Sequence, residues 1–521
     1  MFRILLAALL LLTASAQAET VLHRGKRLEP ATLDPQKTNT QYESHIVLDL
    51  FEGLLTPDAL GHPTLGLADS WQISADGKRY TFHLRPDLKW SDGTILDANA
   101  VVASFRRLMD PKTVARFAQL MYVLKNGRAV NTGAAPTEAL GVNALDGATV
   151  QIDLEAPTAY FPELLADGFA AIVPAGIAGN DAWTQPGTII SSGAYTLEAW
   201  NREDRIVLAR NPRYHDAATV KLDKVIYYPV ADANTAVARF RSGEFDVSIE
   251  FPANLVDELK AIMPAETRID PALITYYLTF NAGRQMFADK NIRRALSLSL
   301  DRDALTDKVL RRGEVPAFSF VPPATANYTP APADFAKWPQ EQRLTEARKL
   351  LADAGYNENH PLKFTLSYST NQDFRRLAVV MAGMWKRVGV EVKIQNVEGK
   401  IHFANLRQGD YDMGFLAWVA DFNDASNFLY ILQSTSVGSN YSRYHNANFD
   451  QLMDQAAATA DTAARAQILH DAETLAMADQ PIAPLFFAVN RNLVHARVKG
   501  WLQNPTDVHP SRTLSVEAPH G

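Results

Sequence analysis

The stretch that decides the fold class is Phe374–Ile394, FRRLAVVMAGMWKRVGVEVKI. Its first part places apolar residues at helical spacing on one face, namely Phe374, Leu377, Ala378, Met381, Met384, Trp385 and Val388. Gly389 is expected to end this helix, and Val390, Val392 and Ile394 then alternate with charged residues as in a half-buried strand. A helix that runs into a strand after a single glycine is typical of an α/β fold.

The same alternation of helices and strands recurs along the chain. Tyr80, Phe82 and Leu84 alternate with polar residues after a turn at Ser74–Gly77, and Asp97 can cap the helix that follows. The spacing of apolar residues predicts further helices at Ile292–Leu300, Leu344–Ala354, Phe374–Val388, Phe449–Ala458 and Ala463–Ala478, a strand at Ala483–Val489, and a proline-rich loop at Val315–Pro339. We therefore expect an α/β protein with mixed β-sheets.

The N-terminus has the pattern of an export signal. Arg3 precedes the apolar run Ile4–Leu12, and Ala16-Gln17-Ala18 forms a small-x-small cleavage site, so we expect residues 1–18 to be removed. A membrane anchor is the alternative, but nine apolar residues are far fewer than the roughly 20 that span a bilayer. Because the chain contains no Cys, it has no lipidation site, disulfide or thiolate chemistry. The mature protein is expected to be periplasmic.

Length and composition limit the class of protein. A chain of 521 residues exceeds what one hydrophobic core usually organises, so two or three domains are expected. The formal charge of −7 is small and spread along the chain, without a basic face for nucleic acid or anionic lipid. We expect no nucleic-acid partner.

The sequence lacks the common signatures of an exported hydrolase. It contains no Gly-x-Ser-x-Gly elbow, no His-Glu-x-x-His zinc motif and no phosphate-binding Gly-rich loop. His470 and Glu473 are three residues apart on an expected helix, which more often indicates a solvated face than a metal site. Glu203-Asp204 is interpreted as solvated surface in the same way. We predict a protein that is not an enzyme and has no cofactor or metal.

The stretch Leu416–Asp424, LAWVADFND, is the clearest candidate for a binding site. Apolar residues and Trp418 lead directly into the carboxylate of Asp421, which we expect to be poorly hydrated. Such a carboxylate needs a cation, and in an exported protein without a catalytic constellation that cation is expected to be the ammonium of a bound ligand.

Several segments together resemble the extracellular solute-binding proteins of the oligopeptide and dipeptide type, family 5, which serve ABC importers. They occur in the family's order across almost the whole mature chain and are Leu33–Pro35, Leu50–Leu55, Leu67–Trp71, Ser74–Arg85, Lys89–Thr94, Gly193–Tyr195, Asn211–Tyr214, the Asn281 region leading to Arg293–Leu296, and Trp418–Asp424. Each segment alone is a weak signal, whereas their shared order is specific.

The resemblance implies a fold of the periplasmic-binding-protein type II-like class, with two lobes of mixed β-sheets joined by two hinge strands and an inserted extra domain. After the signal peptide (1–18), the implied division assigns residues 19–51, 184–280 and 490–521 to lobe I, 52–183 to an inserted domain II, and 281–489 to lobe II (domain III). The hinge strands are expected near Tyr277–Asn281 and Val489–Leu493.

The resemblance also implies the ligand contacts. In peptide-binding members an aspartate after a Trp-x-Ala step pairs with the ligand's α-ammonium, and Asp421 holds that position; a solvated loop Asp is the alternative. Main-chain contacts are expected at Ala417-Trp418-Val419 and around Thr38–Gln41, which includes Asn39, Thr40 and Gln41. Phe117 is expected either to line the cleft or to pack in the core of the inserted domain, and Asn281 to support the hinge or to cap a strand end.

Three positions concern the other end of the ligand. Phe415 stands where some peptide-binding members carry an arginine that helps to hold the ligand carboxylate, and Gly399 replaces an aromatic that can cover a side-chain pocket. Arg407 could supply the positive charge instead, or it could be a surface arginine. A longer, modified or murein-derived peptide is compatible with these departures.

The function implied by the resemblance is that of a monomeric periplasmic subunit that captures oligopeptides between its lobes and delivers them to an ABC permease in the inner membrane. The alternatives are another solute on the same scaffold (murein peptide, glutathione, a nickel or haem complex, an oligosaccharide or an opine) and an exported hydrolase. A third alternative, as an additional role, is a sensory adaptor that presents its ligand to a membrane receptor.

Overall fold

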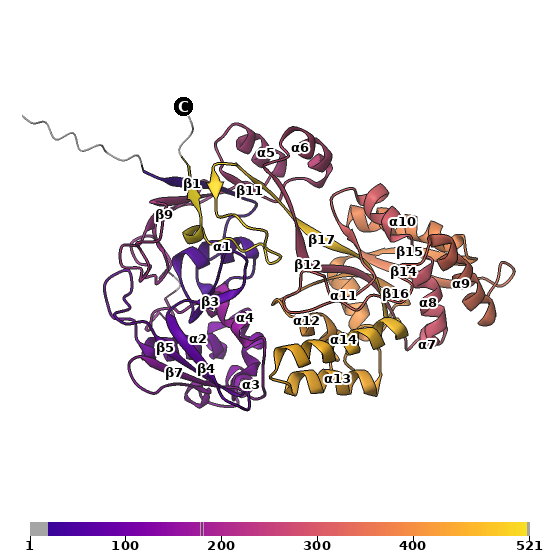
Figure 1. Ribbon diagram of the computed structural model, residues 1–521, viewed down its shortest axis with the longest axis horizontal. Coiled ribbons are helices and arrows are strands. Elements are labelled where there is room, and N and C mark those ends of the chain that lie inside the picture. Colours follow the sequence, from indigo (N-terminus) through magenta and orange to yellow (C-terminus); the bar gives the residue numbers. More distant parts are fainter. Residues whose placement is uncertain (1–18, 178, 181, 518–521) are drawn as a thin grey trace, which may run out of the picture.

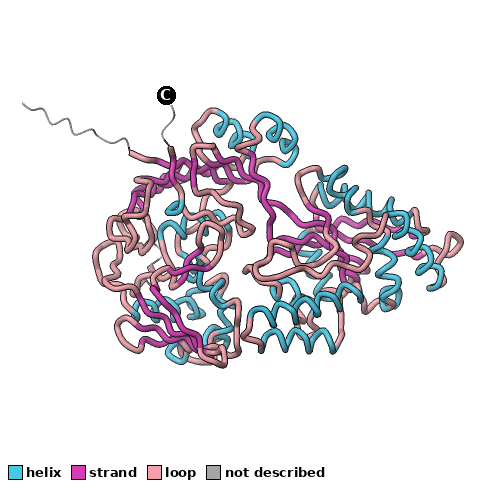
Figure 2. Tube along the Cα trace, in the orientation of Figure 1, coloured by secondary structure: helices cyan, strands magenta, loops and turns pink. Residues whose placement is uncertain are grey.

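The computed structural model describes residues 19–177, 179–180 and 182–517, so the predicted signal peptide at 1–18 lies outside the described residues. Figures 1 and 2 show two bodies that are joined by the long strands β12 (Thr267–Phe280) and β17 (Ile482–Val494). Within the described part of the chain, no helix is both long and apolar enough to cross a membrane.

One mixed sheet of eleven strands runs through both bodies. Its order is β15-β14-β16-β12-β17-β11-β1-β10-β9-β8, and β13 pairs with β17 beside this path. The sheet contains both parallel pairs (β14 with β15 and β16, β1 with β10 and β11) and antiparallel pairs such as β12 with β16. The predicted α/β class with mixed sheets is confirmed.

The first lobe contains the N-terminal half of this sheet. Its strands are β1 (Val21–Lys26), β8 (Tyr195–Asn201), β9 (Arg205–Arg210), β10 (Lys224–Pro229) and β11 (Val247–Ile249), and its helices are α1 (Gln41–Leu50), α5 (Ala233–Arg241) and α6 (Val256–Ile262). The C-terminal strands β18 (Val498–Lys499) and β19 (Ser515–Val516) pair with each other beside it (Figure 1).

The second lobe contains the other half of the sheet and most of the helices. Its strands are β13 (Val315–Pro316), β14 (Leu362–Ser369), β15 (Val390–Val397) and β16 (Met413–Val419). Its helices are α7 (Gln285–Ala288), α8 (Lys290–Leu298), α9 (Gln340–Asp353), α10 (Gln372–Lys386), α11 (Gly399–Gln408), α12 (Ser426–Leu429), α13 (Ala447–Ala458) and α14 (Thr462–Asp479).

An inserted domain with its own core packs below the first lobe (Figure 1). Its strands form a four-stranded sheet of β4 (Ala68–Ile73), β5 (Arg79–Leu84), β7 (Thr149–Asp153) and β6 (Val142–Ala144), and a small pair of β2 (Leu55–Pro57) and β3 (Pro63–Leu65). Its helices are α2 (Ala98–Met109), α3 (Gly127–Asn131) and α4 (Phe161–Ala166). The buried core runs from Leu54 to Ile172. The residue limits predicted for the domains stay predictions.

Local sequence explains why the predicted elements form. The side chain of Asn371 accepts the backbone N–H groups of Asp373 (2.8 Å) and Phe374 (3.2 Å) and so caps α10, whose apolar face includes the wholly buried Trp385. Asp97 caps α2 by accepting the N–H of Ala100 at 3.0 Å. The helices predicted from spacing are present, with ends that differ by a few residues, because capping residues lie outside the apolar stripe.

The strands pass from one lobe to the other at a break in the ladder between β12 and β17. β12 pairs with β17 over Thr267–Pro271 and again over Thr275–Thr279, with a register shift between Pro271 and Thr275. Along the first stretch, β17 pairs on its other side with β11 of the first lobe, and along the second stretch β12 pairs on its other side with β16 of the second lobe. Ala272, Leu273 and Ile274 therefore lack a partner on β17 where the chain passes between lobes. A stretch without a partner on β17 is suited to act as a hinge. It lies a few residues before the predicted hinge stretch Tyr277–Asn281, in which Tyr277–Thr279 pair with both β16 and β17 inside the second lobe.

The interpretation of Glu473 as part of a solvated face was wrong. Its side chain is completely buried, and the proline-rich loop between β13 and α9 covers it. The carboxylate accepts the backbone N–H groups of Phe320 (2.8 Å), Val321 (2.7 Å) and Ala331 (2.7 Å) and the hydroxyl of Tyr328 (2.8 Å). His470 on the same helix is exposed and bonds the carbonyl of Thr329 at 2.9 Å. Glu473 thus fixes the loop to α14.

We expect Glu473→Ala to lower the free energy of unfolding by about 3 kcal/mol or more, because three buried N–H groups lose their acceptor. Urea unfolding followed by circular dichroism measures the change. Asp471→Ala, an exposed acidic residue on the same helix, is the matched control and should change stability little. Equal stability of the two variants would contradict the assigned role of Glu473.

Candidate functional site

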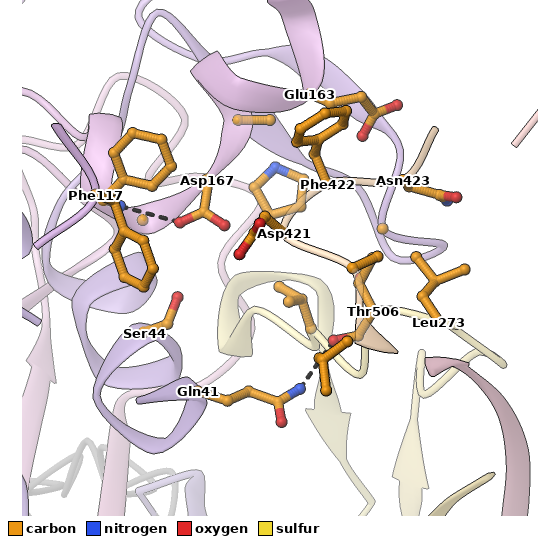
Figure 3. A pocket seen from close by; sticks show the side chains of 18 of the residues that line it. Gln41, Ser44, Phe117, Glu163, Asp167, Leu273, Asp421, Phe422, Asn423 and Thr506 are labelled. Atoms are coloured by element: carbon orange, nitrogen blue, oxygen red, sulfur yellow. Dashed lines mark hydrogen bonds between the residues drawn. The ribbon is translucent and has the colours of Figure 1, made fainter. Parts of the chain in front are cut away.

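A cavity of about 320 Å³ lies between the two lobes and the inserted domain. The first lobe contributes the start of α1 and a C-terminal loop, the inserted domain contributes α4 and the turn after it, and the second lobe contributes the end of β16 (Figure 3). Ala272, Leu273 and Ile274, which have no partner on β17, also line it. The cavity therefore lies at the place where relative motion of the lobes would change its shape.

The position of Asp421 follows from the pairing of β16 with β12. The ladder runs to Val419 opposite Ile274, and the N–H of Ala420 then donates to the carbonyl of Leu273 at 2.9 Å. This bond ties the end of β16 to the hinge and sets the next residue, Asp421, at the edge of the cavity. Figure 3 shows the Asp421 side chain turned into the space between the walls.

The carboxylate of Asp421 is not fully desolvated in this structure. The residue is exposed to solvent within the cavity, where the sequence predicted poor hydration. The protein walls nevertheless raise the pKa of Asp421 above its usual value through burial, and an interaction with the amide of Asn427 partly offsets this rise. The side chain is thus in a concave environment that water still enters because the cavity is open.

Asn427 fixes the backbone beside this carboxylate. Its side-chain oxygen accepts the N–H of Asp421 (3.3 Å) and the indole N–H of Trp418 (3.0 Å). Asn427 itself is only 1% exposed. Trp418 consequently packs against the second lobe, with its ring 5.5 Å from that of Tyr430, rather than against the cavity.

The loop after Asp421 is held by an ion pair and a ring contact. Arg465 on α14 donates to both oxygens of Asp424, at 2.7 and 2.8 Å, in a largely buried pair. Phe422 stacks on Tyr160 of the inserted domain with ring centroids 4.2 Å apart. The second lobe and the inserted domain therefore touch beside the cavity, on the side opposite the hinge strands.

The wall that faces Asp421 carries two further carboxylates, Asp167 and Glu163. Asp167 caps a short 3-10 turn by accepting the N–H of Phe169 at 3.1 Å. Asp167 is exposed to solvent within the cavity, but desolvation by the surrounding walls, together with the nearby charge of Asp421, raises its pKa to about 6. Burial and the charges of Asp424 and Asp58 raise the pKa of Glu163 to about 8. Sequence reasoning missed both residues, because neither belongs to a motif or a periodic pattern.

The first-lobe wall is formed by the N-terminus of α1. Thr40 caps the helix in a reciprocal arrangement with Glu43, whose carboxylate also accepts the N–H of Asn39 at 2.8 Å. Gln41 donates to the carbonyl of Thr506 at 2.8 Å and thereby ties the helix to the C-terminal loop. Of the predicted first-lobe contacts, Asn39, Thr40 and Gln41 all line the cavity.

The structure brings six of the nine predicted site residues to the cavity. Those that line it are Asn39, Thr40, Gln41, Phe117, Val419 and Asp421, whereas Ala417, Trp418 and Arg407 do not. Phe117 combines both expected roles, since it lines the cavity and packs against the core of the inserted domain 5.6 Å from the ring of Phe169. Arg407 is exposed on α11, and its carbonyl accepts a bond from Arg443 at 2.7 Å.

The remaining positions singled out in the sequence have mainly structural surroundings. Phe415 is buried within the second-lobe core, against Phe374 at 4.5 Å between ring centroids. Gly399 begins α11 and faces open space. The side-chain nitrogen of Asn281 donates to the carbonyls of Gly409 (3.0 Å) and Tyr411 (2.9 Å), which joins the end of β12 to the loop before β16.

The ionisable side chains that line the cavity are all acidic. Among its described lining residues are Glu163, Asp167 and Asp421, but no Lys, Arg or His. Across the described ranges, no group of three or more His, Cys, Asp or Glu residues is arranged to hold a metal ion. The site is therefore suited to binding a cationic group by charge and shape.

Comparison with known proteins identifies the family. The model of the bacterial extracellular solute-binding proteins, family 5 (middle part), matches residues 62–440. The chain is 37% identical to the periplasmic murein peptide-binding protein MppA of Escherichia coli over 94% of this chain and 91% of the relative. It is 38% identical to the periplasmic oligopeptide-binding protein OppA of Salmonella typhimurium, over 93% and 90% respectively.

A solved structure supports the same assignment at the level of the fold. The unliganded open form of the murein tripeptide-binding protein MppA aligns with a TM-score of 0.89 at 37% identity, over 96% of this chain and 98% of the other. This agreement confirms the predicted two-lobed class with hinge strands and an inserted domain. The chain belongs to family 5 of the bacterial extracellular solute-binding proteins.

Proposed function

We propose that this chain is the periplasmic substrate-binding subunit of an ABC importer and that it captures oligopeptides in the cavity between its lobes. In this proposal residues 1–18 are a cleaved signal peptide, and the mature protein is a monomer that delivers its ligand to a permease in the inner membrane. It performs no covalent chemistry and needs no cofactor. The peptide-binding names of its relatives support this reading.

The observation that carries the proposal is the position of Asp421 in a cavity without a cation among its described lining residues. A carboxylate that is enclosed by the closing lobes loses hydration, and this loss is costly unless a cation occupies the space. The α-ammonium of a peptide supplies that cation. Ligand binding would therefore favour the closed form by its difference in affinity for the two states.

The edge of β16 supports recognition of the peptide main chain. β14 pairs with β16 only as far as Phe415, opposite Tyr368, whereas β12 continues along the other edge to Val419. In the described part of the sheet, the edge of β16 that faces β14 has no partner strand at Ala417, Trp418 and Val419. An extended peptide can add to such an edge through main-chain hydrogen bonds, which carry no side-chain preference.

This strand edge also explains how Ala417 and Trp418 can contact ligand although their side chains do not line the cavity. Contacts made by backbone N–H and C=O groups do not require the side chain to face the ligand. We keep the expected main-chain contacts at Ala417-Trp418-Val419 and around Thr38–Gln41. Arg407, which is exposed on α11, is assigned no contact.

A murein-derived peptide is the second candidate ligand. The similarity to MppA, which is named as a murein peptide-binding protein, favours it. A murein peptide with a free amino end would use Asp421 in the same way as an oligopeptide, so the two candidates differ in what occupies the rest of the cavity. The likeness to the open form of MppA supports an open state for the present structure.

We expect Asp421→Asn to weaken binding of trialanine by about tenfold to a hundredfold, because a charge-assisted hydrogen bond to the ammonium is lost. Isothermal titration calorimetry at pH 7.5 measures the change. N-acetylated trialanine should bind wild type weakly and should be insensitive to the substitution.

Asp353→Asn is the matched control, since it removes one negative charge from an exposed position on α9 of the same lobe. It should leave the affinity unchanged. If wild type bound acetylated and free trialanine equally well, the proposed role of Asp421 would be wrong.

We further expect saturating trialanine to reduce the radius of gyration in small-angle X-ray scattering, because ligand favours closure about the hinge at Ala272–Ile274. At the same peptide concentration Asp421→Asn should keep the larger radius of the free protein. A radius that does not change on saturation of wild type would exclude closure as part of capture.

A further inference from the structure

The cavity holds more negative charge than one α-ammonium can neutralise. Asp421 lies at the end of β16, and Asp167 lies on the opposite wall, between Phe117 and Asp421 in the view of Figure 3. Asp167 makes no ion pair with any residue that the structure describes; its carboxylate bonds only backbone N–H groups of its own turn. Once a peptide amino end occupies Asp421, the charge of Asp167 remains unmatched.

Glu163 does not fill the same role. It lies on α4 facing Asp424 and Asp58, and Asp424 is already paired with Arg465. With a pKa of about 8, Glu163 is mostly protonated at pH 7 and acts there as a neutral hydrogen-bonding group. Asp167, with a pKa of about 6, is mostly ionised at that pH. Asp167 is therefore the second anion that a ligand meets under neutral conditions.

A buried amide in the cavity wall also lacks a partner. The side-chain nitrogen of Asn490, which lines the cavity from β17, has no hydrogen-bond partner among the described residues. Buried donors without acceptors are rare in folded proteins. A ligand group in the cavity can supply the missing acceptor.

Closure makes the unmatched charge costly. When the walls approach, Asp167 and Asp421 come under stronger mutual repulsion and lose water. A ligand with one positive charge leaves Asp167 to be buried alone or to take up a proton. A ligand with two positive charges neutralises both carboxylates and stabilises the closed form without proton uptake.

We propose that this cavity selects oligopeptides with a second positive charge, Asp421 receiving the α-ammonium and Asp167 receiving a lysine or arginine side chain. This inference rests on the proposed function, because it assumes that a peptide amino end binds at Asp421. Asp167 is then a specificity-determining residue, and neutral side chains are accepted with lower affinity.

The test is a titration with six tripeptides at pH 7.5. Lysine is placed at the first, second or third position of trialanine, and each peptide has a counterpart with norleucine, which keeps the length of the side chain without its charge. In wild type we expect lysine to bind at least about tenfold more tightly than norleucine at one position, as one charge-assisted hydrogen bond provides.

Asp167→Asn should reduce this ratio to within about twofold while norleucine peptides keep their affinity. Asparagine caps a turn as well as aspartate does, so the substitution preserves the bond to Phe169 and the fold. Asp353→Asn should keep the wild-type ratio. The ratio in wild type should also fall between pH 7.5 and pH 5, because Asp167 becomes protonated as the pH falls through about 6.

Equal affinity for lysine and norleucine at all three positions would overturn this inference and leave the proposed function intact. A lysine preference that persists in Asp167→Asn would also overturn it, since another group would then read the charge. Failure of every tripeptide to bind would overturn the proposed function, and this inference with it.

Discussion

The bond from the N–H of Ala420 to the carbonyl of Leu273 is the constraint on which the rest of the site depends. It joins the residue directly after the β16 ladder to the stretch of β12 that has no partner on β17. Because of it, the residue that can receive a ligand's positive charge is attached directly to the segment about which the lobes can turn. Ligand position and lobe position are thereby linked through one strand.

Electrostatics supplies the reason for this link to respond to a ligand. The cavity is lined by three acidic side chains, of which Glu163, with a pKa of about 8, is mostly protonated at pH 7, and no Lys, Arg or His is among its described lining residues. In the open state water enters the cavity and solvates these groups, so their repulsion is tolerable. Closure removes the water and raises the free energy of each unpaired charge. A cationic ligand pairs with these charges, so that closing the cavity lowers the free energy instead of raising it. In this way ligand binding favours the closed shape without contacting distant residues.

Much of the fold could be predicted because its determinants are local. The apolar stripe of Phe374–Val388, the Asp97 cap and the alternation at Tyr80–Leu84 each depend on neighbours in sequence, and the structure contains each element. The role of Glu473 could not be read in this way. Its partners lie on a loop more than 140 residues earlier in the chain, at sequence separations of 142 to 153, and only tertiary packing buries it.

The same distinction holds for the site. Asp421 is found from its segment, because Trp418 and Ala420 accompany it in one short motif. Glu163 lies on the short helix α4 and Asp167 directly follows it, in a segment with no recognisable pattern, and only the folded chain sets them opposite Asp421. Trp418 was selected for its place in the motif, yet its indole turns to Asn427 inside the lobe. The sequence therefore identifies site residues that lie within one short segment, whereas the residues on the opposite wall of the cavity can be identified only from the structure.

The most direct test of the account is a crystal structure of the protein with a bound lysine-containing tripeptide. We predict a closed form in which the α-ammonium lies about 2.7–2.9 Å from a carboxylate oxygen of Asp421, with the peptide main chain along the edge of β16. A peptide bound in the reverse direction, or with its amino end away from Asp421, would contradict the central claim.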